Sequence, residues 1–268
     1  MNFSKVKLIV TDMDGTLLNH KNEVSHRFFS QFKELKKRNI HFVAASGRQY
    51  QSIIEKLDAI KNDISIIAEN GGMMKYDNEE HILLKLTSEN ITTSIGILRQ
   101  INGAHIVLCG RKSAYIETSN PDFISKFTKY YSEYQIVKDL TQVTNDNFLK
   151  IAVFHFECSE ENILPHLTAL KNDMQIIVSG KNWLDISHIK ANKGYALSIL
   201  QKKLGVTKEE TMVFGDYNND LQMLELAYFS YAMENAHAEV KKTARFETKS
   251  NSEEGVELIL EQLITNTN

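Results

Sequence analysis

The sequence has few of the residues that mark several classes of protein. Of its 268 residues only two are cysteines, two are prolines and one is tryptophan. Cys109 and Cys158 show no zinc-binding spacing, and two free buried thiols are the simpler interpretation, although the sequence does not exclude a disulfide. No run approaches 18 apolar residues, and the apolar part of the N-terminus is too short for a signal peptide. We therefore expect a cytoplasmic protein without a membrane span.

A surplus of positive charge is also missing. Lysine and arginine number 31 against 34 aspartates and glutamates, which gives a formal net charge of −3. Nucleic acids and anionic membranes bind basic surfaces, so neither is expected as a partner. A small molecule is the expected partner, and we expect the chain to be a monomer or a weak homodimer.

Apolar strands and amphipathic helices alternate at both ends of the chain. Such strands, when they are apolar nearly throughout, predict a parallel sheet that is covered on both faces. The predicted fold class is α/β, with a Rossmann-like three-layer core made by residues 1–82 and 189–268. Strands are expected at 6–11, 40–46, 63–72, 211–216, 228–233 and 245–248, and helices at 25–39, 49–60, 193–204, 219–227, 236–243 and 253–264.

Residues 83–188 follow a different pattern, with short paired strands between helices. The stretch before them predicts a hairpin that turns at Asp77 and Asn78. We expect an inserted α+β domain with an antiparallel sheet, which would form a cap on the core. Its predicted strands are 104–109, 113–117, 149–156, 175–179 and 183–188, and its predicted helices are 88–101, one that begins at Pro121, and 160–171.

Carboxylates follow two core strands at the point where each strand ends. Asp12 and Asp14 come after the first strand, and Asp216 and Asp220 come after the strand at 211–216. In open parallel sheets, ligands bind beyond the carboxyl ends of the strands, so these four side chains are expected to converge. A hard divalent cation would relieve their repulsion. Oxygen ligands completed by a substrate phosphate are typical of Mg²⁺, which is the predicted cofactor.

Groups that bind anions follow the second core strand and begin a later helix. The hydroxyl of Ser46 and the backbone N–H of Gly47 can donate to a phosphate at a helix start, and Lys193 can add a positive charge. Arg48 is either a substrate contact or the ion-pair partner of a core carboxylate. Within such a site one carboxylate can attack phosphorus, and the carboxyl two residues on can donate and later accept a proton.

Four stretches resemble, in order, the motifs of haloacid dehalogenase-superfamily phosphatases of the Cof-like branch, which carry a large α+β cap. They are DMDGT (12–16), ASGR (45–48), NKG (192–194) and GDYNND (215–220). Two departures from the family pattern are visible. Ser46 stands where threonine is common, which keeps the hydroxyl, and Glu234 stands where glycine is common.

The resemblance implies a role for each motif residue. Asp12 would be the nucleophile and Asp14 the general acid and base, and the family's usual activity is hydrolysis of small phosphomonoesters, often sugar phosphates. Two alternatives stay open, a phosphomutase on the same scaffold and a non-catalytic protein that binds a phosphorylated metabolite. The implied Mg²⁺ ligands are Asp12, the backbone carbonyl of Asp14, Asp216 and, in or next to the coordination sphere, Asp220; the implied phosphate contacts are Ser46, Gly47, Arg48, Lys193 and Asn219.

Overall fold

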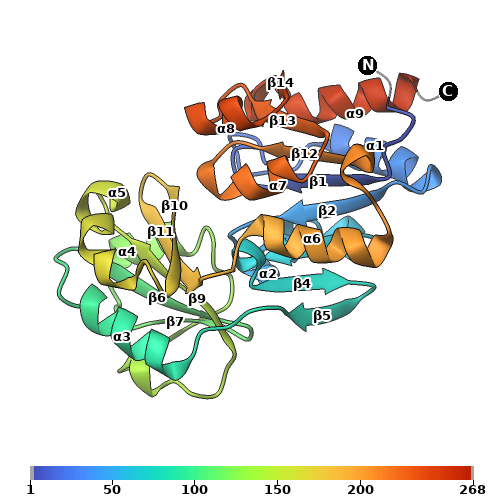
Figure 1. Cartoon of the computed structure of the whole chain (residues 1–268). Coiled ribbons are helices and arrows are strands. Elements are labelled where there is room, and N and C mark those ends of the chain that lie inside the picture. The colour runs from blue at the N-terminus through green and yellow to red at the C-terminus, as the bar shows by residue number, and fades with distance from the viewer. Residues whose placement is uncertain (1–2, 267–268) are drawn as a thin grey trace.

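Two β-sheets organise the chain in the computed structural model, which describes residues 3–266 (Figure 1). The larger sheet has the strand order β14-β13-β12-β1-β2-β3-β4-β5. Neighbouring strands from β14 to β3 are parallel, whereas β4 and β5 are antiparallel additions at one edge. The strands are β1 (Leu8–Asp12), β2 (His41–Ala45), β3 (Ser65–Ala68), β4 (Met73–Tyr76), β5 (Glu79–Ile82), β12 (Thr211–Gly215), β13 (Phe229–Met233) and β14 (Phe246–Thr248).

Helices cover both faces of the larger sheet because successive strand residues point to opposite sides. Ile9 and Phe42 pack beneath α1 and α9, whereas Val10 and Val43 pack beneath α6. The helices are α1 (His26–Lys37), α2 (Tyr50–Lys56) and α9 (Gly255–Asn266) on one face, and α6 (Lys193–Leu204), α7 (Leu221–Glu225) and α8 (Ala238–Thr243) on the other. The three-layer α/β core predicted from the sequence is confirmed.

The smaller sheet lies in the cap, in the strand order β10-β11-β9-β6-β7-β8. Its strand pairs are antiparallel except for β7 and β8, which are parallel. Side chains of α3 pack on one face and those of α4 on the other. The cap elements are α3 (Ser88–Leu98), β6 (His105–Gly110), β7 (Ala114–Ile116), α4 (Pro121–Phe127), β8 (Tyr134–Ile136), β9 (Phe148–Phe154), α5 (Ser159–Asn162), β10 (Met174–Gly180) and β11 (Trp183–His188).

The chain enters the cap after β5 and returns to the core at α6, as Figure 1 shows. The hairpin before the cap turns at Asp77 and Asn78, as predicted, and both residues have a positive φ, of 52° and 60°. Left-handed backbone at both turn positions is typical of tight hairpins. Within residues 3–266 no helix has the length and apolar character that a membrane crossing requires.

The structure differs from the local predictions in four places. The strand expected at 63–72 ends at Ala68, because a 3-10 segment follows at Glu69–Gly71, with left-handed backbone at Glu69 and Asn70. The helix expected at 160–171 is the short α5 followed by a 3-10 segment at Leu164–Leu170, because Pro165 lacks the N–H that an α-helix would use there. Strand β8 was not predicted; its three residues are all exposed, so no alternating pattern marks them. Cys109 is buried as expected, but Cys158 is only half-buried; both are free thiols.

Candidate active site

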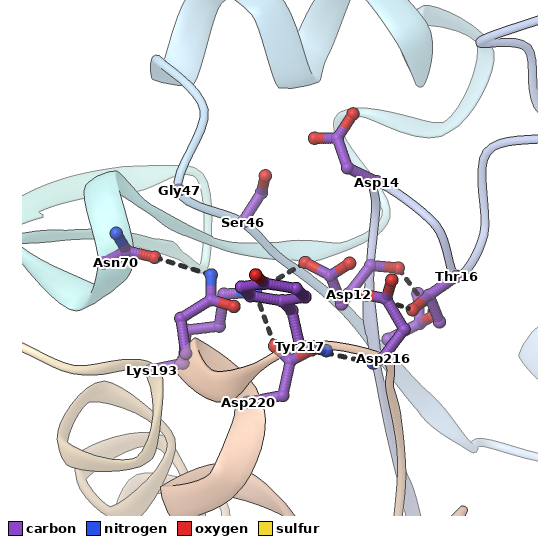
Figure 2. Close-up of polar contacts among 12 residues, drawn as sticks. Asp12, Asp14, Thr16, Ser46, Gly47, Asn70, Lys193, Asp216, Tyr217 and Asp220 are labelled. Carbon is purple, nitrogen blue, oxygen red and sulfur yellow. Dashed lines mark hydrogen bonds and ion pairs between the residues drawn. The ribbon is translucent and has the colours of Figure 1, made fainter. Parts of the chain in front are cut away.

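The side chain of Lys193 lies between two carboxylates, one at the end of β1 and one in the segment that follows β12. Asp12 is the last residue of β1, and Asp220 follows β12. The Lys193 Nζ lies 2.5 Å from Asp12 Oδ1 and 2.6 Å from Asp220 Oδ1, and the lysine has no exposed surface (Figure 2). The structure therefore joins the first, third and fourth motifs through one buried ammonium group. Lys193 is the first residue of α6.

An acidic cluster surrounds the end of β1. Asp12, Asp216 and Asp220 each offer a carboxylate oxygen, and these oxygens lie within 4.8 Å of one another. Burial, only partly offset by Lys193, raises the pKa of Asp12 to about 7, and burial together with Asp12 raises the pKa of Asp216 well above its usual value. Lys193 alone therefore leaves negative charge uncompensated. A divalent cation with oxygen ligands would relieve it, so the donor set fits Mg²⁺.

The turn after β1 is shaped to make room for Asp216. Gly15 has φ of +76°, and a Cβ on it would lie 2.2 Å from Asp216 Oδ2. The hydroxyl of Thr16 donates to Asp216 Oδ1 over 3.3 Å. On the other side, Asp220 Oδ2 accepts from the backbone N–H of Asp216 and of Tyr217. Because its Oδ1 already binds Lys193, both oxygens of Asp220 have protein partners. Asp220 therefore holds the loop and the ammonium group in place.

In Figure 2 the carboxylate of Asp14 points away from Asp12 and Asp216. Its partner is Arg48. The Arg48 guanidinium binds both carboxylate oxygens, with Nη2 2.6 Å from Oδ1 and Nε 2.7 Å from Oδ2. Arg48 is only 4% exposed. Of the two roles left open for Arg48, the structure shows the ion pair with a core carboxylate.

The other predicted phosphate contacts lie around the same pocket. Ser46 and Gly47 line it at the end of β2, and the Ser46 hydroxyl oxygen accepts from the backbone N–H of Arg48 over 3.1 Å. Asn219 lines the pocket from the loop after β12, and its amide donates to Asn70 Oδ1 over 3.1 Å. Helix α2 begins only at Tyr50, so the expected helix start lies a little beyond the loop.

A cavity of about 680 Å³ separates this part of the core from the cap. Its cap side carries aromatic and basic side chains, among them Trp183, Tyr130 and Lys129. Trp183, the single tryptophan of the chain, lines the cavity. Tyr115 instead is buried within the cap, where its hydroxyl donates to Asp146. The cavity is large enough for a small metabolite.

Lys150, which was not predicted from the sequence, is a buried lysine of β9 that connects the cap to the core. Its Nζ donates to the Gly47 carbonyl over 2.6 Å and lies 3.2 Å from Glu69 and 3.3 Å from Asp185. Asn70 extends the connection by donating to Asp185 Oδ2 over 2.6 Å. The available signal was one lysine inside an otherwise apolar strand, FLKIAVF.

Comparison with known proteins identifies the family. The sequence profile of the haloacid dehalogenase-like hydrolases matches residues 9–260. The chain belongs to this family. It is also 32% identical over 266 residues to the 5-amino-6-(5-phospho-D-ribitylamino)uracil phosphatase YbjI of Escherichia coli, covering 97% of this chain and 96% of that protein. The predicted class, a hydrolase of this family with phosphatases as relatives, is confirmed.

Solved structures agree with this assignment. SMU.1108c from Streptococcus mutans superposes with a TM-score of 0.89 at 31% identity, covering 97% of this chain and 99% of that one. TM0651 from Thermotoga maritima superposes with a TM-score of 0.81 at 28% identity, covering 96% and 97%. The likeness spans the core and the cap together, so the inserted cap domain belongs to the shared architecture.

Proposed function

We propose that this hydrolase removes phosphate from small phosphorylated metabolites, with Mg²⁺ as cofactor and a phosphorylated Asp12 as intermediate. The observation that carries the proposal is the buried ammonium of Lys193 between Asp12 and Asp220, because Asp12, together with Asp216, lines a cavity between the core and the cap. A nucleophile, a compensating cation and an acidic cluster together are what phosphoryl transfer to a carboxylate requires.

In the proposed reaction, a carboxylate oxygen of Asp12 forms a bond to phosphorus while the bond from phosphorus to the ester oxygen breaks. Asp14, which lines the same cavity, donates a proton to that ester oxygen as it leaves. Asp14 then accepts a proton from a water molecule that attacks phosphorus and releases Asp12. When bound by Asp12, Asp216 and neighbouring oxygens, Mg²⁺ would supply positive charge to the phosphoryl oxygens.

Lys193 has a supporting part in this scheme. Because its ammonium is buried against Asp12, it holds the carboxylate in one orientation and favours its ionised form. Ser46 and Asn219 reach the cavity from two sides, where their polar groups can bind the phosphoryl oxygens. These roles do not depend on the identity of the leaving group.

The cavity favours a substrate with both polar and planar parts. Lysines and aromatic rings share its cap side, and a volume of about 680 Å³ suits a sugar phosphate or a phosphorylated ribityl compound. YbjI and the Bacillus subtilis relative YcsE, which is 26% identical, are both named as phosphatases of 5-amino-6-(5-phospho-D-ribitylamino)uracil. That compound therefore belongs in the substrate panel beside sugar phosphates.

The test is phosphate release from a panel of about a hundred phosphorylated metabolites, with and without Mg²⁺. We expect hydrolysis of at least one phosphomonoester without a bisphosphate activator, and loss of turnover in Asp12→Asn. Isomerisation without phosphate release would favour the phosphomutase alternative. Binding of metabolites without any turnover would favour the non-catalytic alternative.

A further inference from the structure

We propose that Arg48 is a positioning residue that fixes the carboxylate of Asp14, and that it does so through the closed cap. The inference rests on the proposed function, because it concerns how the proton-transfer group is aimed. It assigns a role to the contact between the ASGR motif and the cap domain.

On the core side, Arg48 binds more than the Asp14 carboxylate. Its Nη2 also donates to Asn22 Oδ1 over 2.8 Å, and its Nη1 donates to the Ser52 hydroxyl over 3.2 Å. Together with the two bonds to Asp14, these contacts set the plane of the guanidinium. A planar fork that binds both oxygens of a carboxylate also fixes the rotation of that carboxylate, which a lysine cannot do.

The same guanidinium also contacts two residues of the cap, Lys129 and Tyr130. Nη1 donates to the backbone carbonyl of Lys129 over 2.9 Å, and the guanidinium carbon lies 4.9 Å from the centre of the Tyr130 ring. Both residues follow helix α4, so they move with the cap. Arg48 is therefore shared between the proton-transfer group of the core and the wall of the cap.

Burial makes this arrangement depend on the cap. Arg48 is 4% exposed, and this burial by itself would lower the pKa of the guanidinium; the hydrogen bonds and ion pair with Asp14, with smaller contributions from Tyr130 and Asp12, outweigh it, so the pKa is raised. Opening the cap would remove the Lys129 carbonyl and the Tyr130 ring and would bring water to the guanidinium, so its plane would no longer be fixed from both sides. The adjacent Gly47 carbonyl is held by Lys150 of the cap in the same closed arrangement. Cap closure thus orders the loop 46–48 at two successive residues.

The leaving group provides a readout specific to proton transfer. An alkyl phosphate needs its ester oxygen protonated as it departs, whereas p-nitrophenolate leaves with little help. We therefore compare p-nitrophenyl phosphate with an alkyl phosphomonoester that the unmodified protein hydrolyses. For Arg48→Lys we expect kcat on the alkyl ester to fall about 100-fold and kcat on the aryl ester to fall less than about 10-fold, with KM changed less than about threefold on either.

The role of the cap in holding Arg48 is tested by substitutions of Tyr130. Tyr130→Leu removes the ring over the guanidinium, whereas Tyr130→Phe keeps it. We expect the leucine variant to show the same preference for the aryl ester, on a smaller scale of about 5–10-fold, and the phenylalanine variant to show little of it. If Arg48→Lys does not fold, the two Tyr130 variants still test the proposal.

Arg111 offers a matched control. It is a cap arginine that ion-pairs with Glu80 of the core, and its guanidinium lies over the ring of Tyr50 at 5.9 Å, so it joins the two domains away from Asp14. Arg111→Lys is expected to change kcat on both esters by the same factor.

Equal losses on the two esters in Arg48→Lys, or an unchanged alkyl rate, would overturn this inference and leave the phosphatase function intact. An equal loss of kcat on both esters in Tyr130→Leu would overturn the proposed role of the cap in holding Arg48. If the unmodified protein with Mg²⁺ hydrolyses neither ester nor any other phosphomonoester, the proposed function fails, and this inference fails with it.

Discussion

Replacing the proposed nucleophile should stabilise the metal-free protein while it abolishes turnover. Asp12 is buried beside two other carboxylates, and its pKa is raised from 3.8 to about 7 although Lys193 lies against it. Asp12→Asn keeps the shape and an oxygen that can accept from Lys193, and it removes a charge that the metal-free fold accommodates poorly. Above pH 3.8, where this carboxyl is ionised in the unfolded chain, Asp12→Asn should therefore be more stable than the unmodified protein.

The size and sign of the gain follow from the shift in pKa. A carboxyl that binds its proton more tightly in the folded state contributes stability below pH 3.8, and this contribution is lost as the pH rises toward 7. About three pKa units at 1.36 kcal/mol each give roughly 4 kcal/mol once the pH exceeds 7. At pH 5 only about a third of this loss has developed, so the advantage of Asp12→Asn should grow by roughly 2–3 kcal/mol between pH 5 and pH 8.

Thermal unfolding in the presence of a chelator measures this difference. For a chain of this size 1 kcal/mol corresponds to about 2–4 °C, so the Tm advantage should widen by roughly 5–10 °C between the two pH values. Asp58→Asn, at an exposed carboxylate that pairs with Lys61, is the control and should show no such widening. A metal-free Asp12→Asn that is less stable than the unmodified protein at pH 8 would show that Lys193 fully compensates Asp12.

Three further outcomes are expected. Mg²⁺ at 100 times its Kd should raise the free energy of unfolding by about 2.7 kcal/mol in calorimetry, and Asp216→Asn should remove most of this gain. Gly15→Ala should lower kcat by at least about 10-fold, because the added Cβ would lie 2.2 Å from Asp216 Oδ2. Gly205→Ala is the control: Gly205 also has a positive φ, but no atom lies within 4 Å of the added Cβ, so this variant should be less stable with kcat unchanged. Lys150→Met should cost about 3–5 kcal/mol at pH 8 by removing the cation from Glu69 and Asp185. The cost should shrink below pH 7, because the pKa of Glu69 is already raised to about 7 and the carboxyl then takes up a proton; an equal Tm loss at pH 6 and pH 8 would contradict this.

Much of the core could be predicted because its signals are local. Apolar strands followed by amphipathic helices specify a parallel sheet with two covered faces, and the carboxyl ends of β1 and β12 then bring Asp12 and Asp216 together. The cap was harder to predict at the residue level. Strand β8 has three exposed residues and exists only because β7 pairs with it, which no local pattern reports.

The side-chain partners of the motif residues also lay beyond the sequence. Arg48 could equally have reached a substrate, and its ion pair with Asp14 depends on where the loop after β2 meets the loop after β1. Lys193 could have been a solvated lysine; it is fully buried because two strands and α6 converge on it. Lys150 was visible in the sequence only as one lysine in an apolar strand, and that pattern does not predict which residues it contacts.

The sequence by itself determined the chemistry that this protein carries and the order in which its motifs appear. Residue type and spacing decide which groups stand at the strand ends, and parallel pairing places those ends at one edge of the sheet. The tertiary structure decided which charges are compensated and which element covers the site. Those properties depend on contacts between residues far apart in the sequence, such as Lys193 with Asp12, Arg48 with Lys129 and Lys150 with Gly47, and only the folded chain brings these residues together.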